Sequence, residues 1–167
     1  MFKTTPETFP GKFLAGDAFD DAHLSLTIPV PSGPPPPVAS VNTLTELRGH
    51  ISVIHATALF HLFSEEKQLE LGKRLMALLD PRPGSIIFGS HGSVPVKGQL
   101  QGFYSKMFCH SPESWTEMWE EQIFEKGQVK VNTLLRDITT ITKKLAGAGP
   151  ADEGAKFYLL EWSVERL

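Results

Sequence analysis

The features that this sequence lacks exclude several classes of protein. Only one cysteine, Cys109, occurs among the 167 residues, which excludes an internal disulfide framework and a structural zinc site built on cysteines. No apolar run approaches the ~20 residues that a membrane-spanning helix needs, and the polar, proline-broken N-terminus is unlike a signal peptide. We therefore expect a cytoplasmic protein without a membrane partner.

The chain also lacks a large excess of charge of either sign. The chain carries 16 Lys and Arg against 19 Asp and Glu, a net charge of -3. This balance provides no basic surface, so we expect no nucleic-acid partner. The glycine-rich phosphate loop, the nucleophile elbow of serine hydrolases and the dinucleotide fingerprint after a strand do not occur. A phosphate-binding or hydrolytic function has no support in the sequence.

The composition is that of an ordinary globular protein, with 41% hydrophobic and 21% charged residues. At roughly 100–200 residues per domain, we predict a single domain over residues 1–167. The 13 prolines are unevenly spread, and residues 29–40 contain six of them. Four consecutive prolines favour an extended conformation without ladder hydrogen bonds. We expect this proline-rich insertion to be a surface connection; a ligand for an adaptor domain is the alternative.

Hydrophobic patterns predict strands that alternate with helices. Ser64 is a helix N-cap, and Pro81 ends the helix that follows it. Ser111 and Pro112 mark the start of a second helix. The expected strands are residues 12–15, 51–54, 84–89, 129–138 and 157–164. This order predicts an α/β fold with a mostly parallel sheet and an antiparallel hairpin at the C-terminal edge.

Polar side chains follow the first three predicted strands. Gly16 and Asp17 come after the first, His55 and Ala56 after the second, and Ser90 and His91 after the third. Ligands of open α/β sheets bind outside the carboxyl ends of the strands. Asp17 is either a hydrogen-bond acceptor for a ligand or a cap of its own turn. Each histidine is either a base or positioning group near neutral pH, or a packed side chain.

Other chemistry-bearing residues have simpler interpretations. His61 follows His55 by six residues, and no metal-binding histidine spacing occurs, so we expect no metal. We expect Cys109 to be a buried free thiol. Trp115, Met118 and Trp119 form a helical stripe that favours a core position over an aromatic ligand cage.

Several segments resemble a known family in their order along the chain. The resemblance is to fungal S-adenosylmethionine-dependent methyltransferases of the Rossmann-like class, in particular the small enzymes of secondary-metabolite biosynthesis. It begins at the third strand and acidic loop of that fold. The segments that carry it are Phe9–Asp20, Ile51–Phe63 with the helix after it, Pro81–Gly92, Phe108–Trp115 and Leu159–Val164.

The resemblance implies a cofactor, a substrate class and residue roles. It places Asp17 and Ala18 beside the adenine ring of S-adenosylmethionine. It places His55 and Ala56 along the cofactor cleft, and His61 and His91 near the methyl-transfer pocket as candidate catalytic residues. The implied reaction transfers a methyl group to an oxygen or carbon nucleophile of a small metabolite.

The chain departs from this family in length. Family members have a first strand with a glycine-rich turn, and an acidic residue after the second strand, upstream of the matched part. We therefore expect a truncated Rossmann-like sheet that lacks its first two strands. Two alternatives stay open. One is a non-methylating homologue that binds a small molecule, acts as an isomerase or cyclase, or dimerises through an exposed sheet edge. The other is an incomplete gene product.

Overall fold

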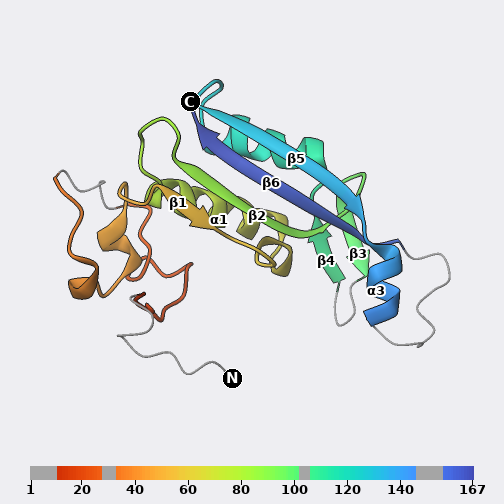
Figure 1. The fold of residues 1–167 in the computed structure, drawn as a ribbon, viewed down its shortest axis with the longest axis horizontal. Coiled ribbons are helices and arrows are strands. Elements are labelled where there is room, and N and C mark those ends of the chain that lie inside the picture. The colour runs from red at the N-terminus through yellow and green to blue at the C-terminus, as the bar shows by residue number, and fades with distance from the viewer. Residues whose placement is uncertain (1–10, 28–32, 102–105, 146–155) are drawn as a thin grey trace.

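The computed structural model describes residues 11–27, 33–101, 106–145 and 156–167. They form a mixed α/β fold around a four-stranded sheet of order β1-β2-β6-β5 (Figure 1). A separate two-stranded sheet pairs β3 with β4. The strands are β1 (Val53–His55), β2 (Ile86–Ser93), β3 (Gly98–Gln101), β4 (Lys106–Cys109), β5 (Val129–Asp137) and β6 (Tyr158–Arg166).

The strand directions confirm the predicted mixed sheet. β1 and β2 are parallel, with Val53 opposite Ile86 and His55 opposite Phe88. β6 lies between β2 and β5 and is antiparallel to both. The predicted antiparallel pairing of the last two strands is therefore confirmed, although helix α3 (Thr139–Leu145) lies between them in the chain.

The strand predicted over residues 12–15 is wrong. These residues have no regular structure, and Phe13 in their middle is 82% exposed. A strand exists only where its backbone pairs with another strand, and neither sheet of the described residues includes this segment. Asp17 consequently follows an irregular segment, not the end of a strand.

The two predicted helices form at their expected start sites. Helix α1 (Glu65–Leu78) begins after Ser64, whose Oγ accepts a hydrogen bond from the amide of Lys67, and it ends before Pro81. Helix α2 (Pro112–Glu117) begins after Ser111 and continues as a π-helical segment, η4 (Met118–Ile123). Three short 3-10 turns complete the elements: η1 (Val38–Ser40), η2 (Leu44–Leu47) and η3 (Phe60–Leu62).

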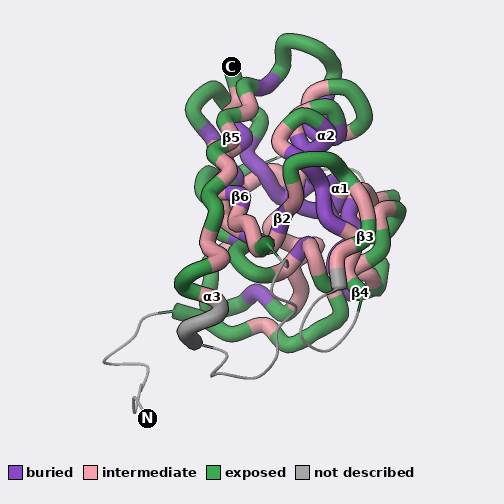
Figure 2. The backbone as a smooth tube through the Cα atoms, turned by 90° about the vertical axis from the view of Figure 1, so that its right-hand side faces the viewer, coloured by how far each residue is buried: buried purple, intermediate pink, exposed green. Residues whose placement is uncertain are grey.

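Helices α1 and α2 cover one face of the sheet (Figure 2). Figure 2 shows the buried parts of the chain gathered between the strands and α1 and α2. The core there is aromatic: Phe60, Trp115, Trp119 and Trp162 are buried, and their rings pack edge-on, tilted or stacked against one another. The predicted core position of Trp115, Met118 and Trp119 is therefore confirmed.

The segment before β1 packs against α1 through the buried Arg74. Its guanidinium pairs with Asp21 at 2.9 Å and with Glu70 at 2.8 Å, and it donates to the backbone oxygen of Leu24. Residues 33–37 of the proline-rich insertion have neither helix nor strand and are mostly exposed, while residues 28–32 lie outside the described part. Within the described residues, none of the helices has the length and hydropathy to cross a membrane.

Candidate functional site

A cavity lies at the edge where the parallel strands β1 and β2 end. Turn η3 follows β1, and the β3–β4 hairpin follows β2. Between these two connections is a cavity of about 260 Å³. This is the position at which open α/β sheets bind ligands. Its lining residues are His61, Leu62, Phe63, Ser64, Gln99, Lys106, Met107 and Phe108.

His61 connects this cavity to strand β2. Its Nδ1 accepts a hydrogen bond from the amide of Gly92 at 3.3 Å, and its ring lies 6.3 Å from the ring of His91. His61 is half-buried, and burial lowers the pKa of its imidazole below the ordinary value. The structure thus brings together the two histidines that the resemblance places near the methyl-transfer pocket.

His91 lies inside β2 and not after it. Ser90 pairs with Glu161 and His91 with Leu160, so the strand predicted to end at Gly89 continues along β6. The side chain of His91 is 2% exposed, and its Nδ1 accepts a hydrogen bond from the indole of Trp162 at 3.0 Å. Burial, with smaller contributions from His61 and His110, lowers the pKa of His91 to about 3. His91 is therefore neutral at physiological pH.

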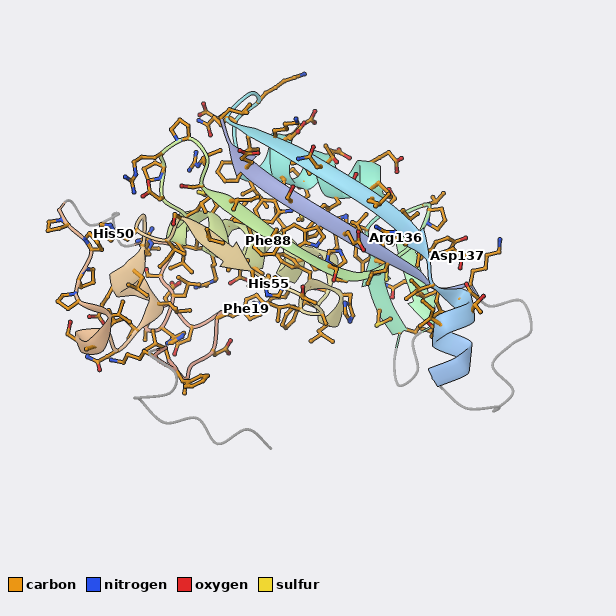
Figure 3. All side chains as sticks on the ribbon, in the orientation of Figure 1. Phe19, His50, His55, Phe88, Arg136 and Asp137 are labelled. Carbon is orange, nitrogen blue, oxygen red and sulfur yellow. The ribbon has the colours of Figure 1, made fainter. Side chains whose placement is uncertain are left out.

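His55 and Ala56 mark the end of β1. His55 is the last residue of the strand, is exposed, and packs its ring 4.9 Å from that of Phe88 (Figure 3). Its Nε2 lies 2.8 Å from Oγ1 of Thr57. Ala56 is buried, and its amide donates to the backbone oxygen of Phe88 at 2.9 Å. A Cβ on Gly89 would stand 2.1 Å from the oxygen of Ala56, so the two backbone segments approach closely here.

Asp17 caps its own turn. Its Oδ1 accepts the amide of Phe19 at 2.9 Å, and its backbone oxygen accepts the amide of Asp20 at 3.1 Å. The local alternative is therefore observed, while the carboxylate remains exposed. The ring of Phe19 packs on that of Phe63 at 5.0 Å, which places this turn beside η3.

Sequence reasoning missed the partners of the histidines. Trp162, Gly92, Gln99 and Lys106 carry no motif, and only the pairing of β2 with β6 and of β3 with β4 brings them to the site. A further buried histidine, His110, lies at the end of the hairpin with Nδ1 2.9 Å from Oγ of Ser114, and burial lowers its pKa to about 4. Within the part of the chain that the structure describes, no cluster of His, Cys, Asp and Glu could hold a metal ion.

Known proteins similar in sequence to this chain are fungal methyltransferases, which confirms the predicted resemblance. The O-methyltransferase phiE of a fungal species is 31% identical over 123 residues, 72% of this chain and 35% of phiE. Methyltransferase adrK of Penicillium roqueforti is 28% identical over 99 residues, 56% of this chain and 35% of adrK. The Asnovolin E/Chermesin D methyltransferase nvfJ of Aspergillus novofumigatus is 26% identical over 91 residues, 50% of this chain and 31% of nvfJ.

The chain spans about a third of the length of these relatives. No protein-family model matches it. Among solved structures, a 1,6-didemethyltoxoflavin-N1-methyltransferase of Burkholderia thailandensis aligns with a TM-score of 0.47 at 11% identity, over 75% of this chain and 49% of that protein. An S-adenosylmethionine-dependent methyltransferase of Mesorhizobium loti aligns with a TM-score of 0.41 at 11% identity, over 71% of this chain and 63% of that protein.

Proposed function

We propose that this chain is a methyltransferase-like domain that transfers a methyl group from S-adenosylmethionine to a small secondary metabolite. One observation carries the proposal: the sequence identity of 31% to a fungal O-methyltransferase over 123 residues. The position of the cavity beside η3, at the ends of the two parallel strands, supports it.

We propose that the adenine of the cofactor binds beside Asp17. The exposed carboxylate of Asp17 uses Oδ1 for its own turn, so Oδ2 can accept a hydrogen bond from an adenine amino group. Ala18, His55 and Ala56 are the other residues that we propose along the cofactor. When bound, the cofactor would supply an electrophilic methyl group, which the nucleophile of the acceptor would take from the sulfonium sulfur in line as S-adenosylhomocysteine leaves.

The protein's own contribution to such a reaction is mainly positioning and exclusion of water. We propose His61 and His91 as the catalytic pair, because their rings lie 6.3 Å apart and His61 lines the cavity. Burial lowers the pKa of both imidazoles. His61 contacts the acceptor molecule, and His91 supports His61 from the core.

Calorimetric titration of the 167-residue chain with S-adenosylmethionine and S-adenosylhomocysteine tests the proposal. We expect micromolar affinity, about -8 kcal/mol, and a loss of at least about tenfold in Asp17→Ala because one charge-assisted hydrogen bond disappears. Asp20→Ala is the matched control: Asp20 is also exposed and also caps its own turn, through the amide of Ala22. A folded, monodisperse sample that binds neither compound contradicts the proposal.

The alternative of a non-methylating module that dimerises through a sheet edge rests on a separate observation. Within the described residues, β1 pairs only with β2, and Val53 on β1 is 58% exposed. An unpaired edge is a template for another strand. Sedimentation equilibrium that finds only monomer at high protein concentration removes this alternative. We also propose a cytoplasmic location, since a reduced, buried Cys109 suits a reducing compartment.

A further inference from the structure

The hydrogen bond from Gly92 fixes which nitrogen of His61 carries the proton. A backbone amide can only donate, so Nδ1 of His61, 3.3 Å from the amide nitrogen of Gly92, must be the unprotonated nitrogen. The proton of the neutral ring is then on Nε2. Protonation of Nδ1 would break this bond and place two N–H groups face to face.

The core below His61 reinforces the neutral state. The ring of His91 lies 6.3 Å away, and the indole N–H of Trp162 holds His91 in the same tautomer, with its proton on Nε2. A charge on His61 would therefore face a second imidazole in a water-poor surrounding. Burial of the His61 ring opposes that charge as well.

The remaining polar group of His61 is available to the cavity. Its Nε2 makes no hydrogen bond within the described residues, and the ring lines the cavity. Gln99, Lys106 and Ser64 line it too, whereas no carboxylate is found among its described lining residues. The cavity thus offers hydrogen-bond donors and a positive charge, a set that suits an oxygen acceptor.

We propose that His61 is a hydrogen-bond donor that binds an acceptor oxygen, a carbonyl or an ionised oxygen, of the ligand in the cavity between η3 and the β3–β4 hairpin. The assignment of that ligand as a methyl acceptor rests on the proposed function. His61 does not take up a proton in this role, because the lone pair of its unprotonated nitrogen, Nδ1, already accepts the hydrogen bond from the amide of Gly92. Trp162 and Gly92 are positioning residues, because they act through the two histidines.

The tautomer can be measured without any ligand. Nitrogen NMR of the histidine-labelled chain at pH 7 distinguishes a protonated Nε2 from a protonated Nδ1, and His61→Gln identifies the His61 signal. We expect His61 to be neutral with the proton on Nε2. A proton on Nδ1, or an imidazolium at pH 7, overturns the proposal. This outcome does not depend on whether the chain transfers a methyl group.

Binding of a simple carbonyl compound tests the donor role. The probe is acetophenone, and ethylbenzene is the matched probe without an oxygen; both are titrated by NMR. We expect His61→Leu to weaken acetophenone binding about five- to tenfold, the effect of one neutral hydrogen bond, and His61→Gln, which keeps an N–H donor, to restore most of it. Ethylbenzene affinity should differ little between the two variants.

His50→Gln is the control for a histidine substitution away from the cavity. His50 lies in the turn before β1 and does not line the cavity. Equal losses in His61→Leu and His61→Gln, or absence of acetophenone binding to the wild-type cavity, overturn the donor role. If instead both probes behave as expected but S-adenosylmethionine does not bind, the proposed function fails and the donor role stands.

Discussion

The two faces of the main sheet have opposite environments although the same strands build both. On β2, Ile87 is fully buried beneath the helices, while its neighbour Phe88 on the other face is 38% exposed. On β5, Leu134 on that second face is 49% exposed, and a shallow hollow of about 440 Å³ lies over it and Phe88. Successive side chains of a strand point to opposite faces, so one residue separates core from surface.

This difference shows where the stability of the chain comes from. The helix-covered face holds a continuous aromatic cluster with the indole of Trp115 in its middle. The open face holds separate apolar side chains with little to pack against. Single apolar side chains of this kind are ordinary on a protein surface.

Removal of Trp115 should have the largest effect. Trp115 is fully buried and contacts the rings of Phe60, His91, Trp119 and Trp162. We expect Trp115→Ala to lower the free energy of unfolding by about 3 to 5 kcal/mol, measured by urea denaturation. Phe88→Ala on the open face is the matched aromatic control and should cost about 1 kcal/mol or less. Equal losses in the two variants would contradict the comparison.

The second-largest effect should come from acid, which should destabilise the helix-covered face of the sheet. Burial lowers the pKa of His91 to about 3 and that of His110 to about 4, against 6.5 for an ordinary histidine. Below pH 6.5 the unfolded chain therefore binds protons that the folded chain does not bind. The stabilisation is complete above pH 6.5 and is lost as the pH falls toward these lower values.

Between pH 7 and pH 5 the two histidines together should lower the free energy of unfolding by about 2 to 4 kcal/mol. Urea denaturation at a series of pH values measures this slope. His110→Asn keeps a side-chain nitrogen or oxygen near Ser114 and removes one of the two titrating groups. A slope that is the same in this variant as in the wild type would show that His110 is not responsible.

Strand β2 carries two glycines with different surroundings: Gly89 lies against a neighbouring backbone segment, and Gly92 has room for a side chain. A Cβ on Gly89 would stand 2.1 Å from the backbone oxygen of Ala56, whereas a Cβ on Gly92 would lie 3.8 Å from Cγ of His61. We expect Gly89→Ala to cost about 2 to 3 kcal/mol, because backbone must move, and Gly92→Ala to cost about 1 kcal/mol or less. Thermal unfolding of both variants measures the difference. A milder effect at Gly89 than at Gly92 would refute this account.

The open face should give the smallest change in stability. Replacement of Phe88 and Leu134 together by threonine introduces β-branched side chains suited to strands and removes the two exposed apolar groups. We expect the free energy of unfolding to change by about 1 kcal/mol or less, while binding of an apolar fluorescent dye falls. A large loss of stability would mean that this face is packed as tightly as the other.

Local patterns predicted helices α1 and α2 and strands β1, β2, β5 and β6, whereas α3, β3 and β4 were not predicted. Ser64 and Pro81 delimit α1 because capping and the missing proline amide are local effects. The strand over residues 12–15 failed because its existence depends on a partner far along the chain. The end of β2 was misplaced for the same reason: pairing with β6 extends it through His91 to Ser93.

The candidate site could likewise be predicted only in part. His61 and His91 could be named from the sequence, and they do lie together. Their chemistry could not be predicted, because the tautomer of each depends on a donor supplied by the long-range fold, the amide of Gly92 and the indole of Trp162. The hairpin that carries Lys106 also has no pattern of its own. Its glycine-rich sequence is compatible with a loop as well as with two short strands.

The single thiol of the chain provides an internal measure of motion at this site. Cys109 ends β4, is fully buried, and has its pKa raised to about 11 by burial. A reagent that attacks thiolates can therefore reach it only after the hairpin separates from the core. The rate of alkylation at neutral pH thus reports how often the wall of the cavity opens. A ligand that occupies the cavity should lower that rate as the fraction of protein with bound ligand rises.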